Sequence, residues 1–489
     1  MSALHPFAAL AAFTLAALCF IVIGFAAARG MRPGVGGFVA AHNSMSATAT
    51  GSTVLATSLG AWILFGPAEM ATWGGIAAVI GYAVAAAAPR FALAVLGLRM
   101  RALMPDQIAV TEFLRRRFGR AMHGFCLVVM VFFLVTTIAA EVTGMALLLA
   151  LIADVPLWLT AALTLAATLL YTSIGGLRAS ILTDRVQVWL ILPFLVLIVI
   201  TAAWQLADLV PALRVVADER PELVSLLHLG GWETALSLIL GLTATSLFNQ
   251  GYWQRVYAAR DRKALVRGFV AAGVAVMPII LILGAFGLVA VGADLAGEPS
   301  VALFAVVLQA VPDWIGFVLV LLGVALVMSS ADTALNALSS IVTADLPRAL
   351  PRMSGRRLLA CARWSGVIAA VPALFVAAQG WSVLYLFLLA NLLCVAAAPA
   401  VVTGLYSAKL SGRAAATATA VGLAAGLALF PDPAMSRGHL LGAYMAALGL
   451  PLAILALARI SVAVRGAADF DFLGLQGPES SASGAENRT

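Results

Sequence analysis

Apolar runs of about 20 residues, the length that a helix needs to cross a bilayer, recur along most of this 489-residue chain. Hydrophobic residues make up 63% of the sequence and charged residues 10%, whereas soluble chains carry about 25% charged residues. So few charges could not cover the surface of a soluble protein. The sequence therefore predicts an all-α polytopic membrane protein, and it excludes a soluble enzyme, a nucleic-acid-binding module and a disordered chain.

The apolar runs number about 13, each near the length that a bilayer requires. No positive charge precedes the first run, as it would in a signal peptide, so we expect a retained span with its N-terminus outside. Two longer connections, 205–233 and 292–312, are expected to hold short extracellular helices. The predicted transmembrane helices cover approximately residues 6–28, 44–67, 72–97, 122–150, 156–174, 182–205, 234–256, 267–291, 314–343, 358–378, 381–405, 414–430 and 438–460.

The positive charges sort to one side of these spans, as the positive-inside rule requires. With the N-terminus outside, the arginine-rich connections 99–120, 255–267 and 348–363 all fall in the cytoplasm. Arg90 lies inside a predicted span, close enough to the cytoplasm for its side chain to reach water. The sequence therefore predicts a multi-pass protein of the cell membrane, with a cytoplasmic C-terminus and a disordered polar tail at 466–489.

Polar side chains at bilayer depth are costly, so they indicate where function lies. In the predicted span 314–343, Ser329, Asp332, Thr333 and Asn336 follow helical spacing and share one face. Such a stripe must face protein, water or a bound ion. Hydrogen bonding between helices is the simpler interpretation, but it rarely requires an aspartate.

Two further polar clusters lie five helices apart. Small and polar residues of the second span run to Ser58 and are followed by Gly60, Gly66 and Pro67, although a packing face of small residues is an alternative. The seventh span contains five polar side chains between 243 and 250, more than local backbone bonding explains. Paired interruptions are typical of two inverted five-helix repeats, with solute and cation bound between broken helices. Na⁺ suits neutral oxygen ligands, and the pattern predicts a cation-coupled secondary transporter.

Two carboxylates allow more than one interpretation. Asp184 begins a helix after a Gly-Gly turn, where it could simply complement the helix dipole. Glu141 lies deep in the fourth span, one turn from Thr137. It is either a buried hydrogen-bonded or protonated carboxyl or a site residue, and the sequence favours neither.

Three segments of the chain resemble motifs of the sodium:solute symporter family. "YTSIGGLRASILTDRVQ" is similar to the family's signature around its fifth core helix, "MSSADTALNALSSIVTADL" to its eighth, and "NQGYWQRVYAARD" to the end of its sixth. The resemblance extends over nearly the whole chain. It implies the LeuT-type fold, in which one helix precedes a ten-helix inverted-repeat core and two helices follow.

This organisation divides the chain into six parts. They are an N-terminal extra helix with a cytoplasmic loop (1–43), the first inverted repeat (44–205), an extracellular loop (206–233), the second inverted repeat (234–405), two C-terminal helices (406–465) and the cytoplasmic tail (466–489).

The resemblance also implies a main sodium site between the second and ninth spans. Its main-chain carbonyl ligands would come from Ala56, Leu59 and Leu326, and its hydroxyl ligands from Ser329 and Ser330.

Some family members bind a second sodium ion near an aspartate that corresponds to Asp184. Ser329 and Thr333 match the hydroxyls of that site, but Asp332 stands where those members have a hydroxyl. This carboxylate could strengthen a cation site or make it proton-linked.

The substrate-lining positions implied by the family fall in the unwound parts of the second and seventh spans and on the third, fourth and eleventh spans. They are Ser58, Trp62, Ile63, Glu141, Thr245, Ser246 and Asn391.

We therefore expect Na⁺-coupled symport of a small polar organic solute, amino acid-like or urea-like, by alternating access. Proton coupling through Glu141 or Asp332 is one alternative, and a membrane sensory module working with a separate signalling partner is another. The five histidines and four cysteines show no metal-ligand or nucleophile–base spacing, so no enzyme is expected. Neither an organic cofactor, a nucleic acid nor an obligate protein partner is predicted.

Overall fold

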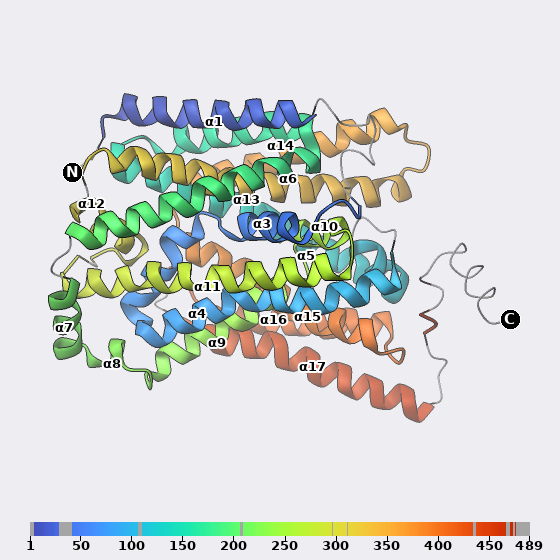
Figure 1. Cartoon of the computed structure of the whole chain (residues 1–489). Helices are drawn as coiled ribbons and strands as arrows, with labels where there is room; N and C mark the ends of the chain where they lie inside the picture. The colour runs from blue at the N-terminus through green and yellow to red at the C-terminus, as the bar shows by residue number, and fades with distance from the viewer. Residues whose placement is uncertain are drawn as a thin grey trace.

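The computed structural model describes residues 4–28, 42–105, 110–205, 209–295, 297–310, 312–433, 437–465, 470–472 and 475. Within these ranges the chain is a bundle of roughly parallel helices (Figure 1), which confirms the predicted all-α class. The long helices are α1 (Pro6–Ala28), α4 (Trp62–Leu103), α5 (Val110–Ala153), α6 (Leu157–Gln205), α11 (Arg262–Gly292), α13 (Ile315–Ala349), α14 (Gly355–Ala378), α15 (Val383–Tyr406), α16 (Gly412–Leu429) and α17 (Leu440–Arg465). The shorter ones are α3 (Ala47–Ser58), α7 (Leu209–Glu219), α8 (Pro221–Val224), α9 (Leu229–Thr245), α10 (Gln250–Ala258), η1 (Pro299–Val301) and α12 (Ala302–Ala310).

Among the described residues, 10 helices are long and apolar enough to cross a membrane. The predicted spans that do not qualify are 44–67, 156–174 and 234–256. The first and third are each divided between two helices, and the second corresponds to the shorter apolar helix Leu157–Ser173. The chain is thus a multi-pass membrane protein, while the count of about 13 spans stays a prediction.

Both predicted helix interruptions are confirmed. The second span divides into α3, which ends at Ser58, and α4, which begins at Trp62. Gly66 and Pro67 lie inside α4 and interrupt nothing. The seventh span divides into α9, which ends at Thr245, and α10, which begins after Asn249. Each break leaves main-chain amides and carbonyls without helical partners, at the depth where a ligand can use them.

The sixth helix bends where the sequence predicts a Gly-Gly turn. Gly176 has φ 52°, a left-handed value that glycine adopts without steric cost. The predicted spans 156–174 and 182–205 are therefore two arms of α6, joined at this residue. The bend brings Tyr171 and Ser180 to the same partner on α13, Asp332.

The helices of the two long connections gather at one end of the bundle (Figure 1). The predicted short helices in 205–233 and 292–312 are present as α7, α8, η1 and α12. The first turn of α1 lies at this same end, and the last turn of α17 lies at the opposite end (Figure 1). This arrangement agrees with a topology that puts the N-terminus and the 206–233 connection on one side and the C-terminus on the other.

Buried positions are most concentrated in α13, where 89% of the apolar window is covered by other helices. It contacts α5, α6 and both α3 and α10 from the two broken helices. Its polar stripe therefore faces protein on all sides. Most of the predicted tail, 466–489, lies outside the described residues.

Candidate functional site

A cavity lies between the two helix breaks and draws its walls from both broken helices and from α4, α5, α13 and α15. It is lined by Thr57, Ser58, Trp62, Tyr82, Pro89, Arg90, Phe133, Leu134, Thr137, Glu141, Leu242, Thr245, Ser246, Asn249, Tyr252, Ser330, Thr333, Ala334, Phe387 and Asn391. Its hydroxyl and amide groups next to the breaks are those of Thr57, Ser58, Thr245, Ser246 and Asn249, and α4, α5, α10, α13 and α15 supply the other polar residues.

All of the predicted substrate-binding residues except Ile63 line this cavity. Ile63 is fully buried one residue beyond Trp62. On the side of the cavity formed by α9 and α15, Thr245 Oγ1 donates to Asn391 Oδ1 at 2.7 Å, and this side-chain hydrogen bond joins the two helices. Trp62 stacks on Tyr82, with ring centroids 5.4 Å apart, and gives the cavity an aromatic wall.

Glu141 ties α5 to the first helix break. Its Oε2 accepts a hydrogen bond of 2.6 Å from the main-chain amide of Ala61, one of the amides that the break leaves without a helical partner. A Cβ atom on Gly60 would lie 1.9 Å from Glu141 Oε1, so only glycine fits at that position. Glu141 is thus a buried, hydrogen-bonded carboxyl that also lines the cavity.

The residues of the predicted main sodium site come from the end of α3 and the middle of α13, two helices that contact each other. Ala56 and Leu59 lie at the C-terminal end of α3, where the amide of Leu59 donates to the carbonyl of Ala56 at 3.0 Å and leaves that oxygen one lone pair for a ligand. Leu326 precedes the serine pair by one turn of α13.

The two serines of this pair differ. Ser329 Oγ donates to Asp184 Oδ1 at 2.8 Å, which leaves its oxygen lone pairs available. Ser330 Oγ is buried and makes no hydrogen bond of normal geometry among the described residues, although the Glu141 carboxyl lies close enough to interact with it. A buried hydroxyl without a full hydrogen bond costs about 1–3 kcal/mol. These neutral oxygens fit a Na⁺ ion, which would give Ser330 the strong contact it lacks.

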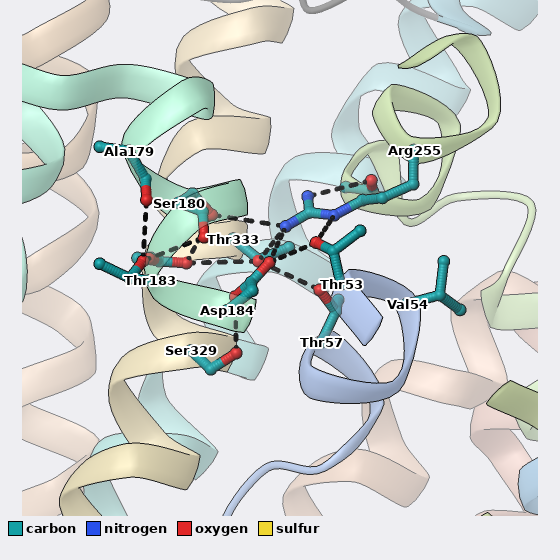
Figure 2. A network of polar contacts seen from close by, with 12 residues as sticks. Thr53, Val54, Thr57, Ala179, Ser180, Thr183, Asp184, Arg255, Ser329 and Thr333 are labelled. Atoms are coloured by element: carbon teal, nitrogen blue, oxygen red, sulfur yellow. Dashed lines mark hydrogen bonds and ion pairs between the residues drawn. The ribbon is translucent and has the colours of Figure 1, made fainter. Parts of the chain in front are cut away.

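Asp184 lies at the centre of a second polar group, drawn in Figure 2. It accepts hydrogen bonds from Thr53 Oγ1 at 2.5 Å and from Ser329 Oγ at 2.8 Å. Arg255 Nη2 completes its shell at 2.9 Å, in an ion pair whose two side chains are 0% exposed. The helices α3, α6, α10 and α13 therefore meet at this one carboxylate.

Asp332 lies beside this ion pair but has its own donors. Tyr171 donates to its Oδ2 at 2.6 Å and Ser180 donates to its Oδ1 at 3.0 Å. Arg255 Nη2 also donates to Thr333 Oγ1 at 2.8 Å. The Arg255 guanidinium thus lies among Asp184, Asp332 and Thr333, the residues of the possible second cation site, and points toward Asp184 in Figure 2.

Charge sorting predicts that Arg255 begins a cytoplasmic connection, and this prediction is wrong. Its side chain is fully buried because α10 continues to Ala258, two residues beyond the predicted end of the seventh span. The sequence did hold a signal: a buried aspartate such as Asp184 calls for a cationic partner.

The predicted extension of Arg90 to the cytoplasmic surface is also wrong. Its side chain is 4% exposed and turns toward the cavity. Its Nε donates to Ser58 Oγ and its Nη2 to the Tyr252 hydroxyl, both at 2.8 Å, and Nη1 donates to the carbonyl of Ala86. Arg90 therefore joins α4 to the residues next to both helix breaks.

Two broken helices that enclose a polar cavity in a helical membrane bundle define a secondary transporter of the LeuT type. The chain belongs to the sodium:solute symporter family, whose sequence pattern matches residues 38–422. This is a family of membrane transporters.

Among curated proteins, the chain is similar to a spermidine transporter of Candida albicans, with 25% identity over 72% of this chain and 66% of that protein. It is 27% identical to a probable urea active transporter of Schizosaccharomyces pombe, over 76% of this chain and 61% of that protein. The matches thus span less than two thirds of the relatives' own length.

Solved structures agree on the fold. A Na⁺-coupled sialic acid symporter in a substrate-bound outward-open state superposes with a TM-score of 0.77 at 17% identity, over 95% of this chain and 99% of that one. A nucleobase-cation-symport-1 family transporter in a closed conformation gives a TM-score of 0.56 at 16% identity, over 88% and 95% of the two chains.

Proposed function

We propose that the protein couples inward movement of Na⁺ to symport of a small polar organic solute by alternating access. The observation that carries this proposal is the buried Ser330 hydroxyl, which faces the cavity beside the first helix break. It makes no hydrogen bond of normal geometry among the described residues, although the Glu141 carboxyl lies close enough to interact with it. The coupling ion would be held by the carbonyls of Ala56, Leu59 and Leu326 and the hydroxyls of Ser329 and Ser330.

The positive charge of Na⁺ holds the C-terminal end of α3, where the first helix break begins, against α13. A ligand shifts a conformational equilibrium only through a difference in affinity between states, and these two helices are the parts of the site that can separate. By reciprocity, bound solute must raise the affinity for Na⁺ by the same factor that Na⁺ raises the affinity for solute. Low Na⁺ inside the cell then releases the ion and the solute together.

The solute would contact Ser58, Trp62, Glu141, Thr245, Ser246 and Asn391 around the cavity, with Ile63 packed behind Trp62. The mixture of hydroxyl, amide and aromatic groups supports a small solute, either amino acid-like or urea-like. The two curated relatives described above are named as a spermidine transporter and a probable urea active transporter, and both of these solutes are small and polar.

The possible second cation site is composed of Asp184, Ser329, Asp332 and Thr333. Because the Arg255 guanidinium already donates to Asp184 and Thr333, a mobile cation could enter only if this side chain moved away. We therefore propose that Arg255 supplies the positive charge at this position and that Na⁺ binds at the main site alone.

For the topology, we propose that the end of the bundle with α7, α8 and α12 faces outside and that the C-terminus is cytoplasmic, in the cell membrane. The arginine-rich connections 99–120 and 348–363 support this orientation. Labelling of single cysteines introduced at 218 and 356 with a membrane-impermeant reagent tests it. We expect only the first to react in intact cells.

The first test of function is substrate-induced charge movement in proteoliposomes, with Na⁺ or choline as the cation and a panel of amino acids, carboxylates and urea. Na⁺ symport predicts a signal only with Na⁺. A signal equal in both cations that follows the pH gradient would transfer coupling to Glu141 or Asp332. Solute binding without any transport would favour the sensory alternative.

A further inference from the structure

Arg90 is a cation at the wall of the solute cavity that the protein leaves without an anionic partner. It forms no ion pair within the described residues, and its hydrogen-bond acceptors are two hydroxyl oxygens and one main-chain carbonyl. The face of the Tyr252 ring, 5.4 Å from the guanidinium carbon, adds a cation–π contact. A buried charge without a counter-ion is costly, so this arrangement requires an explanation.

The nearby carboxylates are already engaged elsewhere. Glu141 lines the same cavity but accepts from the amide of Ala61 at the first break. Asp184 is paired with Arg255, and Asp332 accepts from Tyr171 and Ser180. The charge on Arg90 is therefore free to act on a molecule inside the cavity.

The guanidinium also has unused donors. A guanidinium carries five N–H groups, one on Nε and two on each terminal nitrogen. Arg90 donates its Nε–H to the hydroxyl of Ser58, one Nη1–H to the carbonyl of Ala86 and one Nη2–H to the hydroxyl of Tyr252. One N–H therefore remains on each terminal nitrogen. A carboxylate can accept from one or both of these N–H groups.

Buried arginine by itself does not indicate a ligand, as Arg117 shows. That side chain donates to the carbonyls of Gly404, Ser407 and Leu410, at the junction of α15 and the following connection, away from the cavity. Main-chain carbonyls there hold Arg117 as part of the structure. Arg90 differs because it lines the cavity and uses the hydroxyls of Ser58 and Tyr252, which flank the two breaks.

We propose that Arg90 binds the carboxylate of the transported solute, so that the substrate is a small organic acid. This inference rests on the proposed transport function and narrows its substrate class to the amino acid-like branch. Na⁺ at the main site and a carboxylate on Arg90 would enter as a neutral pair. The stacked rings of Trp62 and Tyr82 are suited to an apolar part of the same solute.

The same charge opposes other solutes. A polyamine would bring like charges against the guanidinium in a site where screening by water is weak. A neutral amide or urea could accept from the two N–H groups but would gain no charge pairing. Specificity at this site is therefore expected to differ from the specificity that the name of the Candida albicans relative states.

The test measures equilibrium binding to the purified full-length protein through tryptophan fluorescence, which Trp62 makes sensitive to the cavity. The panel pairs acetate, pyruvate, benzoate and proline each with the corresponding primary amide, and adds urea and spermidine. We expect at least one acid to bind about tenfold to 100-fold more tightly than its amide, the range of a charge-assisted hydrogen-bonded pair. Arg90→Gln should abolish this preference, and Arg90→Lys should keep part of it.

The proposal is overturned if no acid in the panel binds more tightly than its amide, or if the preference survives in Arg90→Gln. Arg117→Gln serves as a matched control that removes a buried arginine away from the cavity. Should Arg90→Gln fail to fold, Arg90→Lys decides, because it keeps the charge but loses the planar fork. Binding without Na⁺ dependence would contradict Na⁺ symport while leaving the acid preference intact, so the two failures are distinguishable.

Discussion

The two buried arginines next to the helix breaks, Arg255 and Arg90, have opposite surroundings. Arg255 meets a carboxylate at 2.9 Å and is fully enclosed by α3, α6 and α13. Arg90 meets only neutral oxygens and lines the cavity. The protein therefore satisfies one cation internally and leaves the other for a ligand.

This difference shows why burial alone does not identify a binding residue. Removing either arginine deletes one positive charge, but only the removal of Arg255 leaves a buried carboxylate, that of Asp184, without its counter-ion. Replacing Arg255 should therefore lower the stability more, and replacing Arg90 should lower the solute affinity more. The following predictions test this order.

The largest effect is expected from Arg255→Met. It leaves Asp184 buried without its counter-ion, a situation that costs about 3–5 kcal/mol of folding free energy. Thermal unfolding in detergent measures the loss. The double variant Asp184→Asn with Arg255→Met should recover much of the stability, because it removes both charges. A single variant as stable as the parent protein would show that the ion pair contributes nothing.

Arg90→Gln should cost less, about 1–2 kcal/mol. Ser58 Oγ and the Tyr252 hydroxyl lie 3.4 Å apart and can pair with each other once the guanidinium is gone. Unfolding of Arg90→Gln and Arg255→Gln under the same conditions makes the comparison direct. A larger loss for Arg90→Gln would break it and assign Arg90 a structural role.

Ser330→Ala extends the comparison from charges to hydroxyls. We expect the Na⁺ concentration for half-maximal solute binding to rise about five- to tenfold, because one ligand of the ion is lost. Stability without Na⁺ should change little, since the hydroxyl that is removed makes no hydrogen bond of normal geometry among the described residues. Ser339→Ala is the matched control on the same helix, where the hydroxyl donates to the carbonyl of Ala362. Equal Na⁺ curves for the two variants would contradict the site.

Tyr252→Phe should have the smallest effect. It removes one neutral acceptor of Arg90 but leaves Ser58 and the aromatic face in place. We expect a change in acid affinity of about threefold or less, measured by the same fluorescence titration. A loss as large as that of Arg90→Gln would mean that the hydroxyl, and not the guanidinium, binds the solute.

The membrane class, the two helix breaks and the bend at Gly176 follow from the sequence, because apolar length and glycine placement act locally. The positions of the arginines do not. Charge sorting treats a residue near a span end as facing water, and Arg255 lies close to such an end. Arg90 follows the alanine run 85–88, which is apolar on every side and gives no sign of which way the helix is turned.

The sequence also does not predict the difference between Ser329 and Ser330. Both are small hydroxyl residues that adjoin each other in the sequence, which treats them alike. Only the rotation of α13 relative to α6 directs Ser329 to Asp184 and leaves Ser330 without a hydrogen bond of normal geometry among the described residues. Such contacts depend on the packing of distant segments, which no local pattern encodes.

Asp332 joins the two arms of α6 across the bend at Gly176, because Tyr171 lies before the bend and Ser180 after it. Changing the angle between the arms means breaking at least one of these bonds, and hydrogen bonds to a charged group are worth about 1.5–3 kcal/mol each. Each 1.4 kcal/mol slows a step about tenfold. The Asp332 carboxylate thus ties the two arms of α6 together. Its two hydrogen bonds would raise the barrier to any change in the angle between them and so lower the rate of that change.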